Sequence, residues 1–114
     1  MDVYNEILMN IANYDEPEQL RNLLQNYRSL RALFHLGDTV AGSIYIDLHT
    51  ALSSGSLTHL QLQCIVLHLV DGMSLLEVAF ELDKAKTTIQ GHVEGGIRRL
   101  GSCLLSGELY RDGG

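Results

Sequence analysis

Apolar residues recur three or four positions apart along almost the whole chain, and this helical period restricts the fold more than any other feature. No stretch shows the sustained alternation of apolar and polar residues that a half-buried strand requires. The sequence therefore predicts an all-α protein. With 114 residues, of which 46% are hydrophobic, the chain has the size of one domain and enough apolar surface to fold.

Three helices are predicted in the first half of the chain, over residues 2–14, 15–37 and 38–53. Pro17 and the acidic residues around it favour the first turn of the second helix, and Gly37 favours its end. The apolar face of the first helix consists of Tyr4, Ile7, Leu8 and Ile11. The Ser-Ser-Gly-Ser cluster at residues 53–56 ends the third helix and is the candidate domain boundary.

The second predicted helix carries a continuous apolar stripe that is long enough to bind a partner protein. Its members are Leu20, Leu23, Leu24, Tyr27, Leu30 and Phe34. We therefore expect residues 1–55 to form an N-terminal helical segment that binds a partner or pairs with a second copy as a homodimer. Residues 56–106 are expected to form a C-terminal domain, and residues 107–114 a frayed tail.

Two capping boxes predict where helices begin in the second half of the chain. Thr58 with Gln61, and Ser74 with Glu77, each place a hydroxyl three residues before an amide or acid. The second box begins a short helix over residues 75–82, followed by a tight connection and a long helix. A short helix, a turn and a longer helix form the helix-turn-helix arrangement, whose second helix enters the major groove. The residues expected to face the core from the long helix are Ile89, Val93, Ile97, Leu100 and Leu104.

Residues 57–100, LTHLQLQCIVLHLVDGMSLLEVAFELDKAKTTIQGHVEGGIRRL, resemble the fourth conserved region of bacterial sigma factors and the related output domains of response regulators. The matching features are Leu57-Thr58, Asp71-Gly72, Ser74, Val78-Ala79, Thr88-Ile89-Gln90-Gly91-His92-Val93 and Arg98-Arg99-Leu100. Residues 38–52 also look like the helix before this domain in small sigma-like regulators of Gram-positive phages and prophages. The resemblance implies a transcription regulator in the bacterial cytoplasm that contacts promoter DNA, with RNA polymerase as a further candidate partner.

The turn before the long helix departs from the family pattern. Asp83 stands where the family has glycine, and we expect it to take a positive φ, which aspartate tolerates better than most residues. Lys84 and Ala85 replace an aliphatic residue and a serine cap. Gly91 lies on the expected reading face, and it costs helix stability, as do Gly95 and Gly96. We expect close helix packing to explain these glycines.

Nine residues are expected to face or flank DNA, by their positions in the family pattern. They are Lys84, Lys86, Thr87, Thr88, Gln90, Gly91, Glu94, Arg98 and Arg99. Lysine, arginine and threonine suit backbone phosphates, and Gln90 suits an adenine edge. Glu94 repels phosphate unless it accepts a hydrogen bond from a cytosine.

The net charge of −6 supports an alternative function, because proteins that bind DNA through phosphates are usually basic. In this alternative the chain is a protein-interaction module, such as an inhibitor or adaptor, that has kept a sigma-like scaffold and lost or weakened its DNA binding. Residues 84–100 nevertheless contain four basic residues and one acidic residue, so this segment is locally positive.

Other function classes find little support in the sequence. The five histidines form no HxxxH or HExxH pair, and the two cysteines form no CxxC motif, so we expect no metal, no cofactor and no catalytic residue. Cys64 and Cys103 lie in apolar helical patterns, which favours buried thiols in a reducing cytoplasm. Between Asp47 and Asp71 no charged residue occurs, but polar residues interrupt this stretch. We therefore expect buried helices there and no membrane span.

Overall fold

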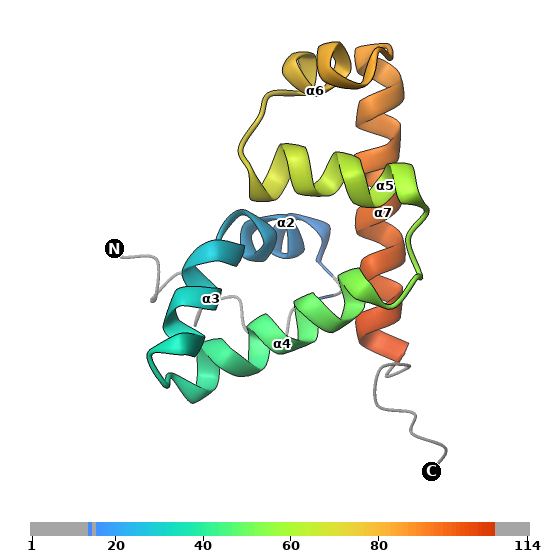
Figure 1. Cartoon of the computed structure of the whole chain (residues 1–114). Helices are drawn as coiled ribbons and strands as arrows, with labels where there is room; N and C mark the ends of the chain where they lie inside the picture. The colour runs from blue at the N-terminus through green and yellow to red at the C-terminus, as the bar shows by residue number, and fades with distance from the viewer. Residues whose placement is uncertain (1–13, 15, 107–114) are drawn as a thin grey trace.

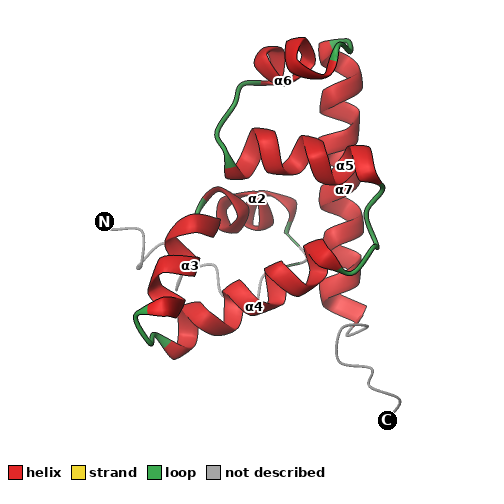
Figure 2. Ribbon diagram, in the orientation of Figure 1, coloured by secondary structure: helices red, strands yellow, loops and turns green. Residues whose placement is uncertain are grey.

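The computed structural model describes residue 14 and residues 16–106, and its regular elements within that range are all helical. They are α2 (Pro17–Gln25), α3 (Tyr27–His35), α4 (Thr39–Ser53), α5 (His59–Ile65), the π-helical turn η1 (Val66–Val70), α6 (Leu75–Leu82) and α7 (Lys86–Ser106) (Figures 1 and 2). The all-α prediction is confirmed. The helix predicted over residues 2–14 and the tail predicted over residues 107–114 lie outside the described residues, apart from Tyr14.

The long helix α7 contacts most of the other helices in the described part of the chain (Figure 1). α5 and α6 pack against it, and α2 and α4 contact it as well. α3 packs mainly on α4, while α2 also reaches η1. Elements from before and after the serine-rich boundary at residues 53–56 therefore meet on the same helix.

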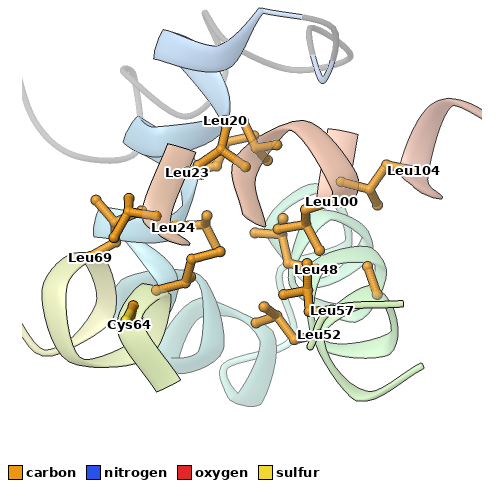
Figure 3. Packing of buried hydrophobic residues seen from close by; sticks show 14 of the residues in the cluster. Leu20, Leu23, Leu24, Leu48, Leu52, Leu57, Cys64, Leu69, Leu100 and Leu104 are labelled. Carbon is orange, nitrogen blue, oxygen red and sulfur yellow. The ribbon is translucent and has the colours of Figure 1, made fainter. Parts of the chain in front are cut away.

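One hydrophobic core joins these elements. The buried side chains of Leu20, Leu24, Leu48, Leu69 and Leu100 come from α2, α4, η1 and α7 and belong to one cluster (Figure 3). The N-terminal helices and the C-terminal helices are thus held together by shared apolar burial, which is the main favourable term in folding.

Most of the apolar stripe that was expected to bind a partner belongs to this core. Leu20, Leu23, Leu24 and Leu30 each expose at most 1% of their surface. Tyr27 is partly buried, and Phe34 is the most exposed member of the stripe. The four leucines do not form a partner surface in this structure, because α7, η1 and α4 already cover them.

The single helix predicted over residues 15–37 is wrong, because the chain bends at Asn26. Asn26 has φ −102° and ψ 15°, and its side-chain amide donates to the carbonyl oxygen of Asn22 at 2.8 Å. This local hydrogen bond is the kind that favours asparagine at helix ends. The bend allows α2 to pack on α7 while α3 packs on α4.

The predicted helix ends are found where glycine adopts a positive φ. Gly37 has φ 91°, and the amide of Asp38 donates to the carbonyl of Leu33 at 3.0 Å, which closes α3. Gly72, with φ 79°, follows η1 in the same way. Both capping boxes are also present: Ser74 Oγ accepts from the amide of Glu77 at 3.0 Å, and Thr58 Oγ1 accepts from that of Gln61 at 3.1 Å.

The substitution Ser74→Ala is expected to lower the free energy of unfolding by about 1 kcal/mol, since it removes the N-cap of α6. The backbone N–H of Ser74, and then its hydroxyl, hold the pKa of Glu77 below its ordinary value. The Glu77 carboxylate therefore adds stability above the ordinary glutamate pKa, and this contribution is lost as pH falls through the lowered pKa. Urea denaturation followed by circular dichroism measures the change. Ser43→Ala, on the exposed side of α4, is the control, and equal losses in both variants would contradict the prediction.

Candidate nucleic-acid interface

Helices α6 and α7 are joined by the three residues Asp83–Ala85. Asp83 has φ 55° and ψ 52°, which confirms the positive φ expected at this turn. Its amide donates to the carbonyl of Phe80 at 3.3 Å, and the amide of Lys84 donates to that of Ala79 at 2.9 Å. These bonds satisfy the last carbonyls of α6 and direct the chain into α7.

The two sides of α7 have different environments. The side facing the core consists of Ile89, Val93, Ile97, Leu100, Cys103 and Leu104, all of them buried. This confirms the inward face predicted from the helical period. The nine residues expected to face or flank DNA are all exposed. Among them, Gln90, Glu94 and Arg98 follow one another at intervals of four residues and so share one face of the helix.

The first turn of α7 has no side-chain cap. The carbonyl oxygen of Ala85 accepts a hydrogen bond from the amide of Ile89 at 3.1 Å, so Ala85 occupies the N-cap position. Alanine has no side-chain oxygen that could accept from the free amides of the first turn. Lys84 and Lys86 flank it, and both are exposed. The free amides of a first turn and two cations together favour an anion such as a phosphate.

Introducing a cap, Ala85→Ser, is expected to raise the free energy of unfolding by about 1 kcal/mol, because the hydroxyl satisfies one of these free amides. Urea denaturation provides the measurement. Ala85→Val is the control, since valine, like alanine, supplies no hydroxyl and is disfavoured at an N-cap. An Ala85→Ser variant no more stable than Ala85→Val would contradict the assignment of Ala85 as the N-cap.

An acidic residue interrupts the exposed face of α7. The side-chain amide of Gln90 donates to Glu94 Oε2 at 3.2 Å, so the two side chains are paired in the free protein. The carboxylate therefore lies between the lysines at the start of the helix and Arg98, which is close to its middle. A nucleic acid approaching this face meets positive charge at both ends and one negative charge between them.

A polar hollow of about 560 Å³ lies where α5 begins beside α7. Arg98 and Arg99 line it together with Thr58, Gln61 and Ser102. The guanidinium of Arg99 donates to the carbonyl oxygen of Ser56 at 3.3 Å. Within residues 14 and 16–106, the structure pairs neither arginine with a carboxylate. Thr58, Gln61 and Ser102 were not expected at this site, since the first two were recognised only as a helix cap.

Close packing against α5 explains Gly95 and Gly96, two of the four glycines in α7. A Cβ atom on Gly96 would lie 2.5 Å from Ile65 Cδ1, and one on Gly95 would lie 3.2 Å from Gln61 Nε2. These glycines let α5 approach α7 closely. A Cβ on Gly91 would meet nothing within 4 Å, so packing does not explain this residue.

The thiols are buried, as expected from their apolar surroundings. Cys64 and Cys103 both lie in the core, and burial raises the pKa of the Cys64 thiol. A thiol of this kind is a poor nucleophile at neutral pH. Across the described residues, no group of three or more His, Cys, Asp or Glu side chains is arranged to hold a metal ion.

Comparisons with known proteins find no similar protein. No family model matches the chain, and no curated protein or solved structure is significantly similar to it. None of the helices in the described part of the chain combines the length and apolar character needed to cross a membrane.

Proposed function

We propose that the protein is a DNA-binding transcription regulator of sigma-like type. In this proposal α6, the turn at Asp83 and α7 act as a helix-turn-helix, and α7 enters the major groove of promoter DNA. The observation that carries the proposal is the exposed face of α7, which has cations at both ends and an inward side that is wholly occupied by the core. RNA polymerase is the second proposed partner, in the cytoplasm of a bacterial host.

The spacing of the cations suits the width of the groove. Lys86 and Arg98 are twelve positions apart in α7, which corresponds to about 18 Å along the helix axis. The major groove of B-DNA is about 12 Å wide. The two side chains therefore reach phosphates on either side of the groove, while Thr87 and Gln90 face the bases. Phosphate contacts of this kind fix the register of a reading helix.

The pair formed by Gln90 and Glu94 adds selectivity to this face. Gln90 has to leave Glu94 before its amide binds an adenine edge with both of its polar atoms. Glu94 then either accepts a hydrogen bond from a cytosine amino group or repels the phosphates of the DNA backbone. The proposed reader is therefore weak on arbitrary DNA, in keeping with the net charge of −6.

The proposal is tested by incubating the purified protein with fluorescent fragments of its source genome at two salt concentrations. We expect a small set of fragments to be retained, and retention to fall steeply as salt rises, because phosphate contacts release counterions. The absence of retention at low salt would contradict direct DNA binding.

A protein-interaction module is the second candidate function, and one observation favours it. Phe80 and Leu76, on one face of α6, expose 90% and 65% of their surface. Glu77 and Glu81 lie beside them and are also exposed. Contiguous apolar patches on the surface of a monomer often mark binding sites, whereas single exposed apolar residues do not. The acidic flank suits a partner with lysine or arginine around an apolar depression, and binding of such a partner by α6 needs no DNA.

A further inference from the structure

A groove of about 490 Å³ runs between the end of α3 and the first turns of α4. Gly42 makes it possible, because a Cβ at this position would lie 2.8 Å from Phe34 Cδ1. The ring of Phe34 therefore packs against bare backbone of α4 and lines the groove together with Ile46. Both side chains are partly uncovered, with 37% of Phe34 and 46% of Ile46 exposed.

The hydroxyl of Tyr14 reaches one end of this groove, while the backbone of Tyr14 lies against α7. Its hydroxyl donates to Asp47 Oδ2 at 3.1 Å, and Asp47 itself lines the groove. Its carbonyl oxygen lies 3.2 Å from where a Cβ on Gly101 would be, so Tyr14 is held between α4 and α7. Burial, and then the neighbouring Asp47 carboxylate, raise the pKa of the Tyr14 phenol, so it remains a donor throughout the neutral range. The thirteen residues before Tyr14 thus join the described part of the chain about one tyrosine side chain away from the groove.

The length and pattern of those residues match the groove. Between Asp38 and Asp47 the groove follows α4 for nine positions, or about 14 Å, and a 13-residue helix, about 20 Å long, is long enough to span it. The apolar residues of the segment, Tyr4, Ile7, Leu8 and Ile11, fall on one helical face. Asp2 and Glu6 fall on the opposite face, away from the carboxylates of Asp38 and Asp47.

We propose that residues 1–13 of the chain form an amphipathic helix that occupies this groove in the same molecule. Ile7 and Ile11 pack on Phe34 and Ile46, and Asp2 and Glu6 face solvent. The occupant is the chain's own N-terminal segment because Tyr14 already positions it there, so that binding requires no encounter between molecules. The assignment does not depend on the proposed DNA binding.

The test uses isotope-labelled full-length protein and nuclear magnetic resonance. We expect nuclear Overhauser contacts between the methyl groups of Ile7 and Ile11 and the Phe34 ring. The substitution Ile46→Asp places a charge in the groove and is expected to speed amide exchange in residues 4–12 by about tenfold or more. Leu76→Asp, an equally polar change at an exposed apolar site on α6, leaves that exchange unchanged.

Ile7→Asp changes the segment instead of the groove and is expected to have the same effect on exchange as Ile46→Asp. Because residue 46 is 46% exposed, its variant retains the core and the experiment reports on docking rather than on unfolding. Rapid exchange of residues 4–12 in the unmodified protein would overturn the proposal. So would contacts that appear between labelled and unlabelled molecules and disappear on dilution, because a second copy would then fill the groove.

Discussion

Replacement of Leu24 by alanine is expected to lower the free energy of unfolding by about 2–5 kcal/mol, the range for a buried leucine whose removal leaves a cavity. Leu24 is fully buried in α2, in the same cluster as Leu69 of η1 and Leu100 of α7 (Figure 3). A domain of this size has a total stability of about 5–15 kcal/mol, so the loss is a large part of it. Since the core is shared, the N-terminal and C-terminal helices are expected to unfold together.

Urea denaturation with two probes measures both parts of this prediction. Tyrosine fluorescence, measured in a Tyr110→Phe background, reports on the remaining tyrosines, all of which precede residue 55, whereas far-ultraviolet circular dichroism reports on all helices. Coincident transitions at a lower midpoint are expected for Leu24→Ala. Leu36→Ala is the matched control, because Leu36 is 82% exposed and its truncation leaves no cavity. Two separate transitions, or equal stability of the two variants, would show that α2 is not part of a common core.

The double variant Lys86→Ala, Arg98→Ala is expected to bind DNA about a hundredfold more weakly at roughly 0.1 M salt, because each lost phosphate contact costs about tenfold. The slope of the logarithm of the binding constant against the logarithm of the salt concentration should become shallower by about 2. Fluorescence anisotropy with a retained genomic fragment measures both quantities. The reduction should apply to all sequences, since phosphates carry no base identity.

The double variant Arg21→Ala, Arg31→Ala is the control for this experiment. It removes the same number of positive charges, but from α2 and α3 instead of α7. This variant is expected to bind DNA nearly as well as the unmodified protein. Glu94→Gln acts in the opposite direction and should raise the affinity for arbitrary DNA, because it removes the negative charge from the middle of the face. Equal loss in both double variants would indicate that overall charge, and not the face of α7, governs binding.

The features predicted correctly from the sequence are those that neighbouring residues decide. A capping box at Ser74, a left-handed glycine at Gly37 and a positive φ at Asp83 depend on a few adjacent residues and on local sterics. The inward face of α7 follows from the helical period alone. The same period could not show what covers each apolar stripe, so the leucines of α2 were expected at a partner surface and are found in the core.

Only part of the candidate site was predicted, because the helical period gives the exposure of a residue but not its contacts with residues distant in sequence. The exposure of residues such as Gln90 and Arg98 follows from the helical period, since they lie outside the buried face of α7. The hollow beside Arg99 depends on Thr58 and Gln61, which are distant in sequence and meet α7 only because Gly95 and Gly96 allow α5 to approach. The bend at Asn26 was missed because asparagine is tolerated inside helices, and only packing of α2 and α3 on different partners makes it necessary.

The division of α7 into a buried side and an exposed side has a consequence for how the protein can evolve. Substitutions at exposed positions away from caps and cores usually change stability by no more than about 0.5 kcal/mol. Thr87, Gln90, Gly91 and Glu94 are all exposed, whereas Ile89 and Val93 between them hold the helix in place. The outward residues are therefore free to vary without unfolding the chain. If they read DNA, a lineage can exchange one target sequence for another by single substitutions while the scaffold stays the same.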